Sequence, residues 1–356
     1  MKVIVAMSGG VDSSVAALLF KEQGAEVIGV TLRLRAGILE GNDGCISGED
    51  EQHAAEVARQ LGIEHVILDH SPDFVDQVLR RSWEEFACGR TPNPCTLCNP
   101  RIKFGKLFEY ADRIGAEIVA TGHYARIEHD NGIARIRRGS DPAKDQTYFL
   151  FGLPQSMVFR IRFPIGELKK EAVRKIAFDA GFVNHNKKDS QDTCFIIPGE
   201  SFQESLRKLF KAPPQTGCFI TPEGKTVGRH QGIHQYTIGQ RKGLGVAMGA
   251  PAYVSRLDRD RNTVTITTSE DDLMAQRFMV SDINWQSGIV PAAPFDAQIQ
   301  VRYRSQAVSG QVMPSGVANA AIALEKPLRA ITPGQAAVFY DQDILLGGGY
   351  IQKLEE

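Results

Sequence analysis

The sequence predicts an α/β protein: a doubly wound parallel sheet forms the N-terminal domain, followed by a small central domain and a C-terminal β-barrel-like domain. Over the first ~200 residues, short apolar runs alternate with amphipathic helical patterns, which is typical of a parallel sheet covered by helices. From Gly217 onward, short alternating runs are separated by Gly, Pro and Asp, which favours an all-β half. Because 356 residues exceed the usual size of one core, we expect domains at residues 1–205, 206–280 and 281–356.

The N-terminal elements follow one another in the order expected of such a sheet. Apolar runs predict strands at residues 2–6, 26–32, 65–69 and 117–121. Amphipathic patterns predict helices at 15–23, 49–61 and 103–114, and Gly62 and Gly115 end the last two. Segments 37–48 and 88–100 lose these patterns, so we expect loops over the carboxyl ends of the strands, where such sheets bind ligands. In the β half, residues 264–267 and 298–303 are predicted strands.

The first strand is followed by the segment Ser8-Gly9-Gly10-Val11-Asp12-Ser13-Ser14, which leads into a helical pattern. Its glycines allow backbone N–H groups to crowd around an anion, its serines add hydroxyl donors, and the helix N-terminus adds partial positive charge. The segment therefore predicts a phosphate-binding loop, although it has neither the ending of a Walker A loop nor the spacing of a dinucleotide-binding loop. A carboxylate beside a phosphate site indicates a metal ion between the two, so Asp12 is a candidate metal neighbour.

The charge balance and the distribution of apolar residues limit the partners that the chain is expected to have. Lys and Arg number 41 against 42 Asp and Glu, so a nucleic-acid partner must be held by a local basic patch. The pairs Lys169-Lys170 and Lys187-Lys188 are expected to be ordinary surface residues. We expect a cytoplasmic protein without a membrane partner, because the start has no signal-peptide pattern and no run approaches ~18 apolar residues.

The six cysteines are too few for a disulfide framework in a chain of this length. Cys95 and Cys98 form a C-x-x-C pair in a proline-rich segment, and Cys194 lies in the polar segment 189–195. This pattern suits a zinc site, an iron–sulfur cluster or a redox pair, with Cys194 as a third ligand. Glycine, proline and polar neighbours indicate that these cysteines are not core residues, whereas the other three, Cys45, Cys88 and Cys218, are expected to be simply buried.

Taken together, these motifs resemble one enzyme family. The segment 8–14 resembles the pyrophosphate loop of the ATP pyrophosphatases, which split ATP between its α and β phosphates. With the segments 91–99 and 189–195 added, the chain resembles the bacterial tRNA-specific 2-thiouridylases nearly from end to end. Further matching segments are residues 121–125, 144–150, 228–232, 236–244 and 301–304.

The resemblance implies an enzyme that uses ATP and Mg²⁺ to adenylate the C2 oxygen of the wobble uridine and then replaces that oxygen with sulfur. AMP and pyrophosphate are the other products. The implied partners are the lysine, glutamate and glutamine tRNAs and a sulfur donor such as a cysteine desulfurase or a relay protein.

The resemblance also assigns roles to individual residues. Cys98 matches the family's nucleophile, and Cys194 matches its persulfide cysteine. The residues that would hold ATP are Ala6, Met7, Ser8, Gly9, Gly10, Val11, Asp12, Ser13, Leu32 and Gly122. The residues that would contact tRNA are Asn93, Pro94 and Cys95 beside the target base, and His123, Lys144, Asp145, Gln146, Arg302, Tyr303 and Gln335 elsewhere.

One position departs from the family. Many relatives carry Asp where this chain has Cys95, so the role of that Asp cannot be transferred. Three cysteines, Cys95, Cys98 and Cys194, are instead available as ligands of a [4Fe–4S] cluster with one open corner. A persulfide relay and a cluster mechanism therefore both remain open. Two functions of other classes also remain: a ligase acting on a small metabolite, and a non-enzymatic scaffold that binds ATP or an iron–sulfur cluster.

Overall fold

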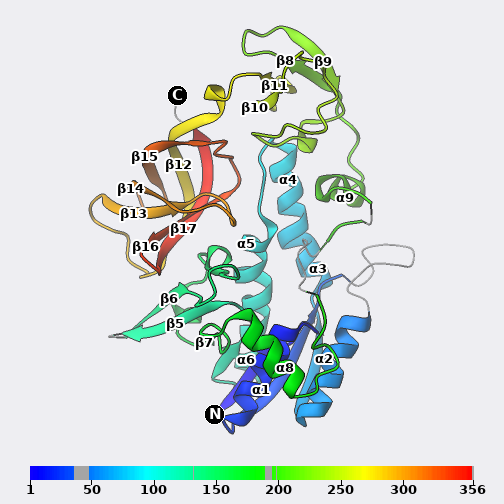
Figure 1. The fold of residues 1–356 in the computed structure, drawn as a ribbon, viewed down its shortest axis with the longest axis vertical. Helices are drawn as coiled ribbons and strands as arrows, with labels where there is room; N and C mark the ends of the chain where they lie inside the picture. The colour runs from blue at the N-terminus through cyan, green and yellow to red at the C-terminus, as the bar shows by residue number, and fades with distance from the viewer. Residues whose placement is uncertain (36–47, 131, 189–194, 198, 355–356) are drawn as a thin grey trace.

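The computed structural model describes residues 1–35, 48–130, 132–188, 195–197 and 199–354. Its N-terminal part is a five-stranded sheet in the order β3-β2-β1-β4-β7, and every neighbouring pair is parallel. The strands are β1 (Lys2–Ala6), β2 (Glu26–Arg33), β3 (Glu64–Asp69), β4 (Ile118–Ala120) and β7 (Ile161–Arg162). The predicted doubly wound sheet is thus confirmed, and it occupies the lower part of Figure 1.

Helices cover both faces of this sheet, because alternate residues of a strand point to opposite sides. Val3 and Val5 of β1 pack in a cluster with α1 (Val11–Glu22), α2 (Gly48–Leu61) and α8 (Lys170–Asp179). Ile4, between them, packs instead with Phe104 and with α6 (Gly105–Ile114). The first loop therefore emerges between two buried layers, at the carboxyl end of a central strand.

Two helical paths connect the sheet to the rest of the molecule. One runs through α3 (Ser71–Phe74), the π-helical turn η1 (Val75–Arg80) and α4 (Arg81–Ala87). The other runs through α5 (Pro94–Cys98), the π-helical turn η2 (Asn99–Phe104) and α6. The expectation of a loop over residues 88–100 is thus wrong for its second half. Proline is tolerated in the first helical turn, where its missing N–H is not needed, so Pro94 starts a helix here.

The central part is a four-stranded sheet in the order β10-β11-β8-β9. Its strands are β8 (Gly217–Ile220), β9 (Thr226–His230), β10 (Tyr253–Asp258) and β11 (Thr263–Thr267), and the last contains the predicted run 264–267. The helix α9 (Phe202–Leu209) and the short turns η4 (Ile233–Gln235) and η5 (Asp271–Leu273) accompany it. Buried Phe219, Val254 and Ile266 belong to its own apolar cluster.

The C-terminal part is an antiparallel barrel closed by the pairing of β12 with β17. Its strands are β12 (Met274–Trp285), β13 (Phe295–Gln300), β14 (Val308–Pro314), β15 (Ala320–Arg329), β16 (Ala336–Asp341) and β17 (Ile344–Leu354). The division expected at residue 281 falls inside β12. The strand predicted at 298–303 ends at Gln300, because the chain turns where the Ser305 N–H donates to the Arg302 carbonyl, at 3.1 Å.

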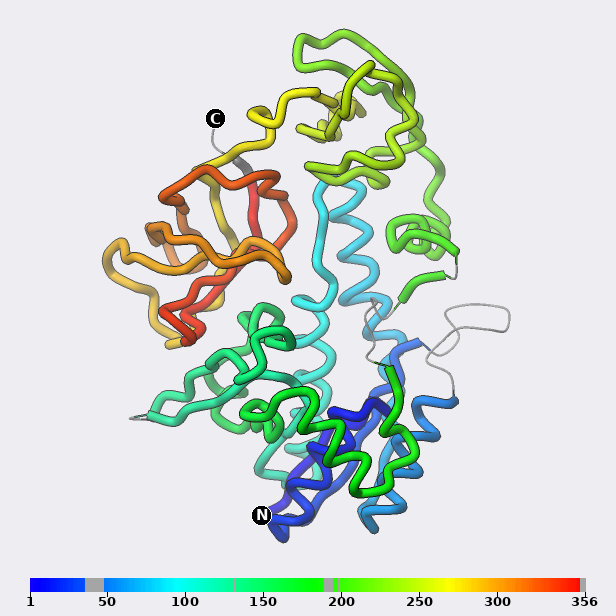
Figure 2. Tube along the Cα trace, viewed as in Figure 1, coloured from blue at the N-terminus to red at the C-terminus, as the bar shows by residue number. Residues whose placement is uncertain are grey.

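A hairpin of the N-terminal part also joins the barrel. It consists of β5 (Ala125–Asp130) and β6 (Ile133–Arg138), and β6 pairs with β17 where Arg137 faces Ile344. Between this hairpin and β7 lie η3 (Thr147–Phe149) and α7 (Gln155–Val158). Figure 2 shows that the trace from 94 to 114 runs between the barrel and the parallel sheet. None of the helices in the described ranges combines the length and apolar character needed to cross a bilayer.

Candidate active site

The conformation of the loop after β1 is fixed by hydrogen bonds between its own residues. Gly9 has φ +73°, in the left-handed region that favours glycine, and Gly10 is the N-cap of α1. The Ser13 hydroxyl accepts from the Ser8 N–H at 3.2 Å and donates to the Gly10 carbonyl at 3.0 Å. The helix begins at Val11, earlier than the predicted residue 15, so Asp12 lies in its first turn. This is the loop-to-helix geometry that suits a phosphate.

Residues distant in the sequence also form hydrogen bonds to this loop. The side-chain amide of Asn184 donates to the Gly9 carbonyl and to the Ser14 hydroxyl, each at 3.0 Å. The Lys187 ammonium contacts the Gly9 carbonyl at 3.4 Å and pairs with the Asp50 carboxylate. Lys187 was expected on the ordinary surface, and the structure instead places it at the loop. Sequence reasoning missed Asn184, for which no motif gave a signal.

Asp12 is surrounded by partners from other elements. The Lys170 ammonium lies 2.7 and 2.8 Å from its two carboxylate oxygens, and the Tyr124 hydroxyl donates to Oδ1 at 2.8 Å. Gly122 packs against the Asp12–Ser13 peptide so closely that a Cβ would lie 2.7 Å from Ser13 N. Both oxygens of Asp12 are thus already bound by donors.

This arrangement does not fit the expected role of Asp12 as the neighbour of a metal ion. A Mg²⁺ ligand needs a carboxylate oxygen that faces the ion, whereas Lys170 supplies positive charge to both oxygens of Asp12. The described residues also contain no group of three or more His, Cys, Asp or Glu side chains placed to bind a metal. Asp12 is therefore placed as the partner of Lys170 and not as a ligand of Mg²⁺.

The neighbouring strand ends add polar groups to the loop's surroundings. The Thr31 hydroxyl at the end of β2 donates to the Met7 carbonyl at 2.6 Å, and Leu32 follows it at the edge of the core. Beyond β4, the Thr121 hydroxyl lies 2.7 Å from Nδ1 of His123. Burial, followed by the nearby Lys103 charge, lowers the pKa of His123 to about 3, so the ring is neutral.

The C-x-x-C pair lies on α5. The Asn93 side chain accepts from the Cys95 N–H at 3.1 Å and so caps the helix, with Pro94 in its first turn. Cys95 and Cys98 are one turn apart, which places both on one side of the helix. Cys95 is half-buried.

The expectation that Cys98 is not a core residue is wrong. It is only 5% exposed and belongs to an apolar cluster with Phe74, Leu79 and Phe195. Two helical paths and the segment around Phe195 converge on this position, a long-range contact that local composition could not reveal. Cys194 and Cys45 lie outside the described residues.

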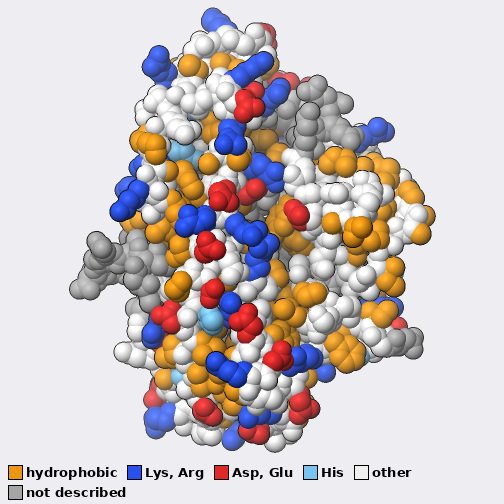
Figure 3. Space-filling view, turned by 180° about the vertical axis from the view of Figure 1, so that it is seen from behind, with side chains coloured by type: hydrophobic (Ala, Val, Ile, Leu, Met, Phe, Trp, Pro, Cys, Tyr) orange, Lys and Arg blue, Asp and Glu red, His pale blue; other side chains and the backbone are white. Residues whose placement is uncertain are grey.

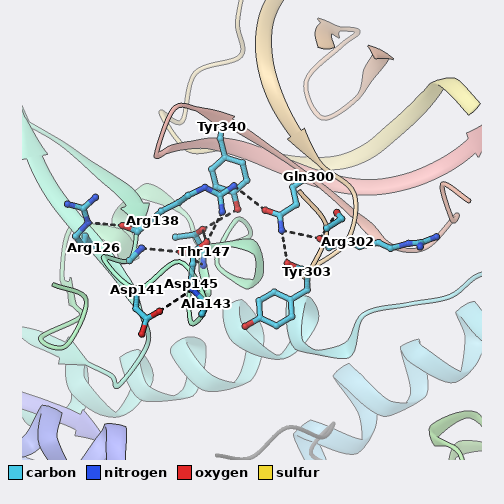
Figure 4. Close-up of polar contacts among 12 residues, drawn as sticks. Arg126, Arg138, Asp141, Ala143, Asp145, Thr147, Gln300, Arg302, Tyr303 and Tyr340 are labelled. Atoms are coloured by element: carbon cyan, nitrogen blue, oxygen red, sulfur yellow. Dashed lines mark hydrogen bonds and ion pairs between the residues drawn. The ribbon is translucent and has the colours of Figure 1, made fainter. Parts of the chain in front are cut away.

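The segment 144–146 is built into the fold by its own hydrogen bonds. Oδ2 of Asp145 accepts from Arg138 and from the Thr147 hydroxyl, each at 2.8 Å. The Gln146 side chain accepts from the Tyr124 N–H at 3.0 Å. Lys144 is half-buried beside them. The close-up in Figure 4 shows the contacts of Asp145 below the ring of Tyr340.

Arg302 and Tyr303 lie at the start of the turn after β13. Arg302 donates to the Ala330 carbonyl and lies 3.4 Å from the Thr332 hydroxyl, and burial lowers its pKa. The Tyr303 ring centre is 4.3 Å from that of Phe149. Burial, followed by the Asp145 charge, raises the pKa of Tyr303. Arg138, which donates to Asp145, also donates to Gln300, and the Gln300 amide donates to the carbonyls of both turn residues, so the structure brings the segment 144–146 and the turn 302–303 together (Figure 4).

Thr91 joins three parts of the molecule just before α5. Its N–H donates to the Pro333 carbonyl at 2.9 Å, and its carbonyl accepts from the Gln335 side chain at 2.8 Å. Its hydroxyl lies 3.1 Å from the hydroxyl of Thr237 in the central part. Gln335, assigned to tRNA by resemblance, therefore has a partner within the protein.

The charged surface seen from behind is mixed. Figure 3 shows Lys and Arg side chains interspersed with Asp and Glu along this face, and no broad area of one sign. On this face a nucleic acid would therefore meet positive charge only as local groups, in keeping with the near-zero net charge of −1.

Three family models match successive parts of the chain. Residues 1–198 match the tRNA methyl transferase HUP domain, 209–268 the tRNA methyl transferase PRC-barrel domain, and 275–351 the aminomethyltransferase β-barrel domain. Among solved structures, a 4-thiouridine synthetase–RNA complex with bound ATP aligns at a TM-score of 0.37 and 18% identity, over 59% of this chain and 50% of that one. That likeness is too distant to inform the site.

Curated relatives match over nearly the whole length. The tRNA-specific 2-thiouridylase MnmA of Solibacter usitatus is 42% identical over 98% of this chain and 99% of its own. The MnmA proteins of Clostridium acetobutylicum and Geobacillus thermodenitrificans are 40% and 42% identical, each over 99% of this chain and over 99% and 95% of their own. With this identity over its full length, the chain belongs to the tRNA-specific 2-thiouridylase family.

Proposed function

We propose that this chain is an ATP-dependent tRNA sulfurtransferase. It adenylates the C2 oxygen of the wobble uridine at the loop 8–14 and replaces that oxygen with sulfur delivered at α5. ATP, tRNA and a sulfur donor such as a cysteine desulfurase or a relay protein are its partners. The tRNAs that we expect it to accept are those for lysine, glutamate and glutamine.

One observation carries the proposal. Gly122 packs against the Asp12–Ser13 peptide, and its neighbour His123 stacks on Phe104, with ring centres 5.8 Å apart. Phe104 lies in the helical path that begins with the cysteine turn. Two consecutive residues thus connect the phosphate loop to the helix that carries Cys98, so that activation and sulfur delivery can share one substrate.

In the relay mechanism, a Cys194 persulfide provides the sulfur. Its outer sulfur attacks C2 of the adenylated uridine, and AMP leaves with the former C2 oxygen. Cys98 then attacks the sulfur of Cys194, which releases 2-thiouridine and leaves a Cys98–Cys194 disulfide for a reductant to reopen. Phe195, which follows Cys194 in the chain, packs in the same apolar cluster as Cys98, and this supports the pairing.

A [4Fe–4S] cluster is the second candidate mechanism, because Cys95 and Cys98 lie one turn apart on α5 and offer two thiolates to the same side. Cys194 would be the third ligand. The cluster would bind the attacking sulfide at its open corner.

One variant separates the two mechanisms. Cys95→Asp removes a cluster ligand but leaves both relay thiols. With a persulfide donor in air, we expect it to keep substantial tRNA thiolation. After anaerobic iron–sulfide reconstitution, we expect no absorbance near ~400 nm in either this variant or the parent. A brown, active parent beside a colourless, inactive Cys95→Asp variant would overturn the relay.

The overall function is tested by adding unmodified tRNA. A thiolase releases pyrophosphate and forms thiouridine only with that tRNA. The pyrophosphate release of a ligase of small metabolites would not respond to this tRNA, and a scaffold would release none in either case.

A further inference from the structure

Lys170 is buried although it is a lysine in the first turn of a helix. Its residue is 7% exposed, and it begins α8. Lysine is rarely buried without an anionic partner, and a positive charge at a helix N-terminus is disfavoured by the helix dipole. The expectation that Lys169-Lys170 are both ordinary surface residues is thus wrong for Lys170 and agrees with the exposed Lys169.

The partner of Lys170 is a loop residue far away in the sequence. Its ammonium contacts both carboxylate oxygens of Asp12, at 2.7 and 2.8 Å, and the Tyr124 hydroxyl supports the same carboxylate at 2.8 Å. The Lys170 ammonium also lies 5.8 Å from the centre of the Tyr124 ring. The carboxylate itself remains partly open, since the Asp12 side chain is 30% exposed. The ion pair therefore lies in the first turn of α1, immediately beyond the glycines of the loop.

We propose that Lys170 is a positioning residue of the ATP site, which holds and neutralises Asp12 so that the triphosphate meets a paired carboxylate and not a bare negative charge. The proposal rests on the proposed use of ATP. Without the ammonium, the Asp12 carboxylate would repel the phosphates in a partly buried site, where charges are poorly screened. The presence of Asp12 in an anion-binding loop therefore does not require a metal ion, because Lys170 neutralises its carboxylate.

Two neighbouring lysines supply a matched pair of variants. Lys170→Met in the full-length chain should raise the dissociation constant for ATP by about tenfold or more, because a single unpaired like charge then faces the phosphates. Lys169→Met removes an equal charge from the adjacent exposed position and should leave ATP binding as in the parent. Binding is measured by calorimetry, and thermal unfolding reports whether each variant is folded.

The double variant Asp12→Asn, Lys170→Met distinguishes neutralisation from packing. It removes both charges, so it should recover most of the ATP affinity that Lys170→Met loses. If Lys170 acts only as a packed side chain, the double variant will bind ATP as weakly as Lys170→Met, and the proposal is overturned. It is also overturned if Lys170→Met binds ATP like the parent.

Two further outcomes keep the test decisive. If Lys170→Met does not fold because the Asp12 carboxylate is left unpaired, the double variant alone decides, since it removes that carboxylate together with the lysine. If the parent itself does not bind ATP, the proposed function fails, whereas a parent that binds and variants that do not respond refute the role of Lys170 alone.

Discussion

A single methyl group at Gly122 should disable the phosphate loop. In Gly122→Ala, the new Cβ would lie 2.7 Å from both Asp12 C and Ser13 N and 2.9 Å from Asp12 O. Comfortable contacts are about 3.5–4.0 Å, so the backbone on one side must move by about 1 Å. Overpacking of this kind costs about 2 kcal/mol, which lowers the melting temperature by about 4–8 °C in a domain of this size.

The displaced atoms belong to the turn that offers N–H groups to phosphate, so function should suffer more than stability. We expect kcat for tRNA-dependent pyrophosphate release to fall by about 100-fold, as for other ~1 Å misplacements in active sites. The assays are thermal unfolding with and without ATP and pyrophosphate release. Gly48→Ala is the control, because its Cβ would lie no closer than 3.6 Å to Gln52 Nε2. A Gly122→Ala protein that melts and turns over like the parent would refute the reasoning.

Three further predictions test separate parts of the site. Cys98→Ser should bind ATP like the parent in calorimetry and form no 2-thiouridine by nucleoside analysis; weakened ATP binding would contradict the separation of the two steps. The folded state lowers the pKa of His123 from 6.5 to about 3. Between these two pH values the imidazole takes up a proton in the unfolded chain but not in the folded one, so the free energy of unfolding decreases as the pH falls. His123→Gln should therefore lose less stability between about pH 6.5 and pH 4 in urea titrations, and an unchanged slope would argue against a neutral ring in the folded state. Thr91→Val and Thr237→Val should each cost about 1 kcal/mol, with no further cost in the double variant, because they share one hydrogen bond; additive costs would show that the hydroxyls do not interact.

The sequence predicts four of the five strands of the parallel sheet well, because each is a short apolar run followed by polar residues, and it misses β7, which has only two residues. β2 ends at Arg33, one residue past its predicted end, and β4 covers the middle of its predicted range. The start of α1 is less well predicted. The continuous apolar run begins only at Val15, whereas three of the four residues of the first turn, Asp12, Ser13 and Ser14, are polar and favour a loop.

Features that depend on distant contacts could not be predicted. Cys98 sits among proline, asparagine and threonine in the sequence, yet Phe74, Leu79 and Phe195 bury it. Lys170 belongs to a charged pair that looks like solvated surface, and only the folded chain shows that it reaches Asp12. Local sequence patterns reflect residues that are adjacent in the chain, whereas the chemistry of this site depends on contacts between residues that are far apart in the sequence.

The hydrogen bonds of Thr91 have a mechanical consequence. The residue is held by its N–H and its carbonyl to the barrel and by its hydroxyl to the central part, and Gly334, at φ +91°, lies so close that a Cβ there would be 2.9 Å from the Thr91 nitrogen. Thr91 is thus fixed in position by three hydrogen bonds to other parts of the molecule. A displacement of the barrel would therefore be transmitted through these hydrogen bonds to the start of α5, the helix that carries Cys95 and Cys98.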